Sequence, residues 1–158
     1  MDSIDKTIIS TLQKNGRTTN VELARLAQLA PSSMLERVRR LEERGVIKGY
    51  RAVLDPTALG YNVQAIIMIT LEHSQLNMID ETEQRIKSIP EVKACFLLAG
   101  IHDFMVHVVV RDIEHLAHLV KYKLYEVGIM RSQETFLILS PLQEDEGYSL
   151  ECMDDEAK

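Results

Sequence analysis

The stretch from residue 31 to residue 44 carries cations at helical spacing beside a row of apolar residues. Side chains three or four positions apart share one face of a helix. Four polar residues follow this spacing: Ser33, Arg37, Arg40 and Arg44. An α-helix fits the major groove of DNA, where an arginine can hold guanine through two parallel hydrogen bonds and short polar side chains can approach phosphates. The pattern therefore predicts a DNA-recognition helix.

The predicted DNA contacts extend along this helix and into the basic segment after it. The complete set is Ser32, Ser33, Glu36, Arg37, Arg39, Arg40, Arg44, Lys48 and Tyr50. Spacing alone leaves open which arginine reads a base and which contacts a phosphate. A second interpretation is a solvated helix face on which the arginines pair with nearby glutamates. The capped helix before it, the break at Ala30 and Pro31, and the basic segment after it favour DNA binding.

The distribution of charge supports the same interpretation, although the net charge of the whole chain is −6. Residues 1–55 have a balance of +3, whereas residues 56–158 have a balance of −9. Binding of a polyanion depends on the local field and not on the total charge. Residues 143–158 are rich in Asp and Glu, and we interpret them as a solvated acidic tail.

Three short helices would position the basic face, over residues 3–14, 20–28 and 31–45. Thr19 and Glu22 have the spacing of a capping box at the start of the second helix. In the third helix we expect Leu35, Val38 and Leu41 to point inward. Residues 46–54 have the composition of an extended segment. Together residues 1–54 predict a winged-type helix-turn-helix domain, followed by a linker at residues 55–61.

The remainder of the chain alternates between strand and helix patterns. Strands are predicted at residues 64–71, 92–99, 104–110 and 132–140, and helices at residues 78–88 and 112–127. This βαββαβ order is typical of a ferredoxin-like domain, here residues 62–142, so the fold class is α+β. The strands carry large apolar residues on both faces, and the helices can cover only one. We therefore expect the second face to meet another copy of the chain.

These features resemble the Lrp/AsnC (leucine-responsive/asparagine regulator) family across nearly all of residues 1–142. The resemblance rests on residues 4–24 with Asn15-Gly16, on Leu35-Glu36-Arg37-Val38-Arg39-Arg40-Leu41-Glu42, and on Gly45-Val46-Ile47-Lys48-Gly49-Tyr50. It implies a sequence-specific transcriptional regulator that binds double-stranded DNA. It also implies homodimers joined through the C-terminal sheets, assembly into octamers, and a cytoplasmic, nucleoid-associated prokaryotic protein. Amino acids are the usual effectors, bound near the interfaces between dimers.

The resemblance also indicates an effector site at the turn Gly100-Ile101-His102-Asp103, with Thr135 and Phe136 as walls. In the family this turn often contains Gly-Asp-Tyr-Asp, so one carboxylate and one aromatic ring are replaced here. Asp103 could pair with the ammonium group of an amino acid, and backbone N–H groups near Gly100 could bind its carboxylate. An alternative of equal weight is that Asp103 stabilises the turn and binds no ligand.

The family often has serine where this chain has Ala30, before the proline. That serine would cap the recognition helix, and Ser32 or Ser33 could compensate by starting the helix later.

Other chemistry has weaker support in the sequence. His115 and His118 lie three positions apart, but no third metal ligand is evident, so we interpret them as surface residues. We expect no catalytic residue, cofactor, metal or membrane segment. Two alternatives stay open: an enzyme similar to siroheme decarboxylases, which resemble these regulators in architecture, and a ligand-binding interaction protein that does not bind DNA.

Overall fold

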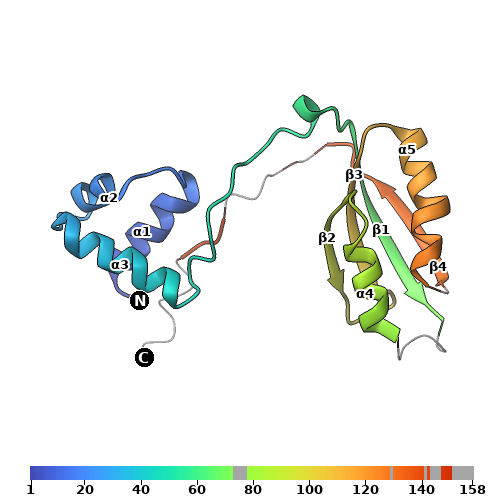
Figure 1. Cartoon of the computed structure of the whole chain (residues 1–158), viewed down its shortest axis with the longest axis horizontal. Coiled ribbons are helices and arrows are strands. Elements are labelled where there is room, and N and C mark those ends of the chain that lie inside the picture. The colour runs from blue at the N-terminus through green and yellow to red at the C-terminus, as the bar shows by residue number, and fades with distance from the viewer. Residues whose placement is uncertain (73–77, 129, 141, 143–146, 151–158) are drawn as a thin grey trace. The chain divides into compact units, whose positions relative to one another are not determined.

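The computed structural model describes residues 1–72, 78–128, 130–140, 142 and 147–150. The chain divides into two compact units, built on Met1–Val53 and on Leu54–Leu142 (Figure 1). In the described part of the chain, none of the helices has both the length and the apolar character needed to span a membrane.

The first unit consists of three helices, α1 (Ser3–Lys14), α2 (Asn20–Leu26) and α3 (Pro31–Glu43). Asp2 caps α1 by accepting a hydrogen bond from the Asp5 N–H. The predicted capping box is confirmed at α2: Thr19 accepts from the Glu22 N–H, and the Glu22 carboxylate accepts from the Thr19 N–H. These side chains satisfy backbone donors that have no partner within the helix.

The core of this unit brings one stripe from each helix together. It contains Ile8, Leu23, Ala24, Met34, Val38 and Leu41. Our expectation for Leu35 was wrong, because its side chain is 56% exposed and Met34 is fully buried in its place. The inward stripe of α3 therefore begins one residue earlier, at spacings of four and three, and this rotates the helix face that meets solvent.

The segment after α3 turns at Gly45, whose φ of +69° lies in the left-handed region and ends the helix. The structure assigns no strand to residues 46–55, all of which it describes, so the expected extended segment forms no ladder there. Tyr50 returns to α3 and donates a hydrogen bond to a Glu42 carboxylate oxygen at 3.0 Å.

Part of the predicted acidic tail contacts α1. The Gln13 side-chain amide donates to the Tyr148 carbonyl at 3.0 Å and accepts from the Tyr148 N–H at 2.7 Å. The backbone of Tyr148 is therefore attached to α1, although its side chain is exposed. The acidic residues at 144–146 and 151–156 lie outside the described residues.

The second unit is a four-stranded antiparallel sheet with the order β2-β3-β1-β4. The strands are β1 (Val63–Leu71), β2 (Val92–Leu97), β3 (Phe104–Val110) and β4 (Met130–Leu137), and α4 (Ile79–Lys87) and α5 (Ile113–His118) lie on one side of the sheet (Figure 1). This arrangement confirms the ferredoxin-like prediction. The last strand begins and ends earlier than expected, and β2 ends at Leu97.

The helix after β3 is less regular than expected. Asp112 caps it as predicted, accepting from the His115 N–H at 2.7 Å. The α-helical part ends at His118, a π-helical turn follows at Leu119–Lys123, and a 3-10 turn follows at Tyr125–Val127.

The core of the second unit lies between the helices and the alternating residues of the central strands, such as Ile67, Phe104 and Val106. Alternate residues of a strand point to opposite faces. The residues between them, such as Ile66, Met68 and Met105, are only half-buried, because none of the described helices covers that face.

Candidate DNA-binding and effector sites

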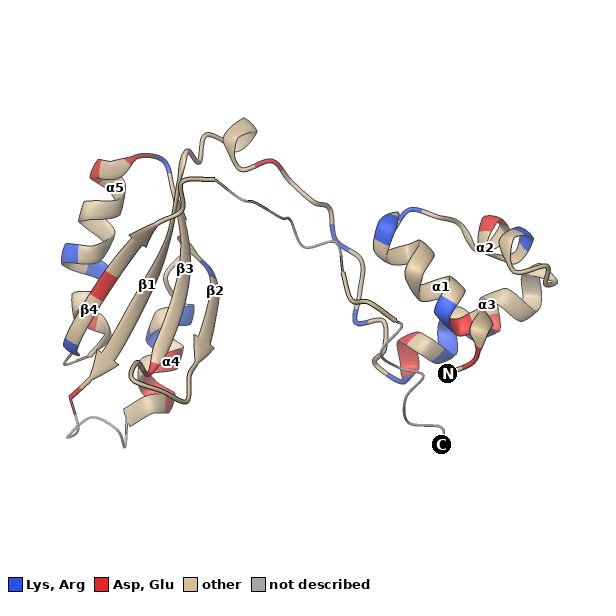
Figure 2. Ribbon diagram, turned by 180° about the vertical axis from the view of Figure 1, so that it is seen from behind, with Lys and Arg blue, Asp and Glu red and all other residues tan. Residues whose placement is uncertain are grey.

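The outward side of α3 presents most of the predicted DNA contacts to solvent. Ser32, Ser33, Glu36, Arg39, Arg40 and Arg44 are all exposed. The opposite side is held in the core by Met34, Val38 and Leu41, which fixes the rotation of the helix. Basic and acidic positions both lie along the exposed side (Figure 2). The geometry therefore provides a rigid helix with a polar surface that a groove could receive.

Arg37 differs from the other arginines because it is tied to the start of α1. Its Nη1 lies 2.7 Å from Asp2 Oδ2 and 2.9 Å from Asp5 Oδ1. Those contacts raise the pKa of the Arg37 guanidinium, while the hydrogen bonds from the Asp5 N–H and from Arg37 lower the pKa of the Asp2 carboxyl. Arg37 thus joins α3 to α1, a role that the local sequence pattern did not indicate.

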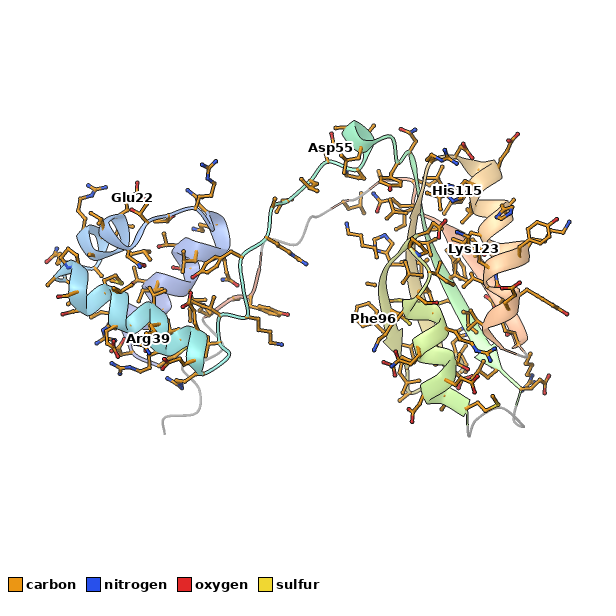
Figure 3. All side chains as sticks on the ribbon, viewed as in Figure 1. Glu22, Arg39, Asp55, Phe96, His115 and Lys123 are labelled. Carbon is orange, nitrogen blue, oxygen red and sulfur yellow. The ribbon has the colours of Figure 1, made fainter. Side chains whose placement is uncertain are left out.

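Arg39 and Tyr50 also have partners within the first unit. Arg39, labelled on α3 in Figure 3, lies 2.9 Å from a Glu43 carboxylate oxygen in an exposed pair four residues apart. Such pairs are weak and exchange readily with other partners. Burial and the hydrogen bond to Glu42 raise the pKa of the Tyr50 hydroxyl. Arg40, Arg44 and Lys48 take part in no ion pair within the described part of the chain.

The start of α3 has no side-chain cap. Ala30 is its N-cap residue and Pro31 occupies the first turn, so the helix does not begin later at Ser32 or Ser33. The expected compensation by these serines is therefore wrong. Their hydroxyl groups lie in the first turn of α3 instead.

The predicted effector turn is anchored to β1 by several hydrogen bonds. Asp103 Oδ2 accepts from the Leu71 N–H at 2.7 Å, and the Asp103 N–H donates to the Ile69 carbonyl at 2.9 Å. The Thr70 hydroxyl lies 3.3 Å from the Ile101 carbonyl and 3.1 Å from His102 Nδ1. The Asp103 carboxylate thus stabilises the turn by binding the backbone of β1. The Ile101 side chain is 85% exposed.

The structure does not bring Thr135 and Phe136 to this turn within one chain. Thr135 pairs with Ile67 and Phe136 with Ile66, three and four residues before Thr70 along β1. At the usual rise of about 3.4 Å per residue, they lie roughly 10–14 Å along the sheet from the turn. As consecutive strand residues they also point to opposite faces, so both cannot line one side of a pocket.

The sequence did not indicate one cluster of polar side chains, which is formed around Glu91. Glu91 Oε1 lies 2.9 Å from His115 Nε2 and 2.5 Å from Lys123 Nζ. Figure 3 labels His115 and Lys123. Burial acts to raise the pKa of the Glu91 carboxyl, but hydrogen bonds from Lys123 and His115 outweigh it and lower the pKa to about 2. His115 is therefore not the surface residue that we expected, because it contacts a carboxylate 24 residues earlier in the chain.

Two family models match different parts of the chain. Residues 1–48 match a winged helix-turn-helix DNA-binding model, and residues 64–148 match the Lrp/AsnC ligand-binding domain. These two ranges correspond to the unit that carries α3 and to the unit that carries the sheet.

Similar whole proteins are also known. The leucine-responsive regulatory protein of Haemophilus influenzae is 31% identical over 144 residues, covering 91% of this chain and 87% of that protein. A transcriptional regulator of Neisseria meningitidis, solved as a complex with L-Met, has 27% identity and a TM-score of 0.91, covering 97% of this chain and 99% of that one. AsnC of E. coli has 27% identity and a TM-score of 0.84, covering 91% and 95%.

Proposed function

Because this chain belongs to the Lrp/AsnC family of DNA-binding transcriptional regulators, we propose that it reads its operator through the exposed side of α3. The observation that carries this proposal is the buried stripe of Met34, Val38 and Leu41, which turns the serines and Arg40 toward solvent on a fixed helix. A helix held in this way can enter the major groove with its first turn near base edges.

The contacts within the first unit support different roles for Arg37 and for the other arginines of α3. Arg37 is held by two carboxylates of α1, so moving it to DNA requires breaking both contacts. Among the described residues, Arg40 has no ion-pair partner, so it is available to contact guanine or phosphate. A bidentate contact with guanine contributes roughly 1–3 kcal/mol of discrimination. We propose that Arg40 and Arg44 contact DNA directly, with Lys48 following the phosphate backbone, and that Arg37 positions the helix.

We further propose a division of labour in which residues 1–54 bind DNA and residues 62–142 form dimers and bind an effector. The half-buried apolar face of the sheet supports the dimer, because a monomer would leave it in water. Octamers, a cytoplasmic location and nucleoid association are part of the same proposal. Two recognition helices in one dimer require half-sites about one helical turn (~10 bp) apart, or a multiple of it.

We propose that the effector is an amino acid, as in the similar Neisseria meningitidis regulator solved with L-Met. The proposed site combines the turn at residues 100–103 with Thr135 and Phe136. Because one chain holds these two groups apart, a pocket that uses both requires two chains. The one remaining oxygen of Asp103 and the backbone of the turn would meet the ammonium and carboxylate groups of the ligand.

The test is binding of the full chain to the DNA upstream of its own gene across a salt series, with and without a panel of amino acids. We expect selective, salt-sensitive binding, because each released phosphate counterion contributes to affinity. Arg40→Ala should weaken specific binding at least tenfold, whereas Arg131→Ala, an exposed cation of β4, should leave it unchanged. Equal affinity of wild type and Arg40→Ala would refute the assignment of the α3 face, and an unselective protein would favour the alternative functions.

A further inference from the structure

The backbone of Tyr148 is bound to the first unit by both ends of one side-chain amide. Gln13 Nε2 donates to the Tyr148 carbonyl at 3.0 Å, and Gln13 Oε1 accepts from the Tyr148 N–H at 2.7 Å. The two residues are 135 positions apart in the sequence. Gln13 is exposed on α1 and lies outside the buried core of the unit. We call this pair of hydrogen bonds the Gln13–Tyr148 contact.

The residue before Tyr148 allows this contact because it is a glycine. The φ of Gly147 is +95°, a backbone conformation that residues with a side chain rarely adopt. A Cβ atom at this position would lie 2.6 Å from Gln13 Oε1 and 2.8 Å from Gln13 Cδ. Both distances are shorter than van der Waals contact, so a side chain at residue 147 would push the Gln13 amide away from its partner.

The chain that leads to this contact leaves the sheet beside the chain that enters it. Ile138 follows β4, and its N–H donates to the Gln64 carbonyl of β1 at 2.9 Å. Because β1 and β4 are antiparallel neighbours, the start of β1 and the end of β4 lie side by side. The first unit is thus connected to this end of the sheet twice, through the linker before β1 and, by way of the Gln13–Tyr148 contact, through the chain after β4. A unit held by one connection can turn about it, whereas a second connection restricts that rotation.

We propose that the Gln13–Tyr148 contact is a second tether that limits how far the first unit rotates against the sheet, and that it thereby restricts the half-site spacings that the protein accepts. This inference rests on the DNA-binding function and the dimer proposed above. Two recognition helices of one dimer bind together only when their half-sites lie about one helical turn (~10 bp) apart, or a multiple of it. Units that rotate freely tolerate misplaced half-sites, and tethered units reject them.

Hydrogen exchange of the full chain without DNA, followed by mass spectrometry of the peptide that contains Tyr148, tests whether the contact forms in solution. The Tyr148 N–H should exchange at least about threefold more slowly in wild type than in Gln13→Ala or Gly147→Ala, because both variants remove its acceptor. The matched control is Gln84→Ala, which changes an exposed glutamine of α4 and should leave this exchange unchanged. Equal exchange in wild type and Gln13→Ala would overturn the inference.

Two DNA probes then test the consequence for binding: the natural operator, and the same operator with about five base pairs, half a helical turn, inserted between its half-sites. The insertion should weaken binding by wild type and by Gln84→Ala at least about tenfold, and this penalty should be at least about threefold smaller in Gln13→Ala and Gly147→Ala. An unchanged penalty in both variants, with the exchange difference present, would overturn the role given to the contact and leave the DNA-binding function intact. A wild type that binds no operator selectively would refute the proposed function and this inference with it.

Discussion

Replacing Glu91 by glutamine is expected to destabilise the second unit. The change keeps the size of the side chain but removes the charge that accepts hydrogen bonds from His115 and Lys123. The Glu91 pKa falls from 4.5 to about 2, and one pKa unit corresponds to about 1.4 kcal/mol, so the full effect is about 3 kcal/mol. Lys123 is 37% exposed and can regain water, which reduces the expected loss to about 1–3 kcal/mol.

The destabilisation should depend on pH with a defined sign. The folded pKa of Glu91 lies below its unfolded value, so the folded state binds fewer protons. Its contribution is complete above about pH 5 and is lost as the pH falls from 4.5 towards 2. The difference between wild type and Glu91→Gln should therefore be constant from pH 7 to pH 5, and roughly half of it should remain at pH 3.

Urea unfolding of the full chain, followed by circular dichroism at fixed protein concentration, measures this difference. Glu81→Gln is a suitable control, because its exposed pair with Arg85 should contribute no more than about 0.5 kcal/mol. The reasoning would be refuted if Glu91→Gln were as mild as the control at pH 7, or if its effect were equally large at pH 3.

Two further predictions concern α3, and both use the same unfolding measurement. Ala30→Ser should raise the free energy of unfolding of the first unit by about 0.5–2 kcal/mol, because the helix has no side-chain cap there; no gain would mean that the serine hydroxyl does not reach the first turn. Met34→Ala should cost roughly 2–5 kcal/mol, whereas the adjacent Leu35→Ala should cost less than about 1 kcal/mol. Equal losses would contradict the rotation of the helix described here.

The order of elements was predictable because local chemistry determines where they begin and end. The pairing of Thr19 with Glu22, and the cap at Asp112, depend on residues three positions apart that the sequence displays directly. Strand positions followed from runs of β-branched residues in the second unit. The sheet order then follows from the limited number of ways in which βαββαβ can be connected.

The rotation of α3 was not predictable from its own sequence. Met34 and Leu35 are adjacent and both apolar, and they lie four and three positions before Val38, so each is at helical spacing from that residue. Which of these two side chains is buried depends on the residues of α1 and α2 that pack against the helix, such as Ile8 and Leu23. Periodicity shows that a helix has an apolar side, but it locates that side only to within about one residue.

The polar contacts of the turn at residues 100–103 and those of Glu91 join residues that are far apart in the sequence. His115 contacts Glu91 only because the fold brings α5 beside the residue that precedes β2. A histidine three positions from another histidine gave a local signal for a metal pair, but the structure gives His115 a carboxylate partner and places the ring of His118 beside Tyr122. Sequence spacing therefore identified residues that can bind ions or form polar contacts, but it did not identify the residues with which they pair.

The internal pairing of Arg37 changes how the charge of the first unit acts on DNA. Two carboxylates lie within hydrogen-bond distance of its guanidinium, so the local field around this arginine is close to neutral or negative. The positive field available to phosphates therefore shifts along α3 towards Arg40, Arg44 and the basic residues that follow the helix. A DNA-binding surface centred there needs Arg37 to keep α3 fixed against α1, because a recognition helix that rotates loses the register of its base contacts. The same residue can thus be essential for operator binding without contacting a base.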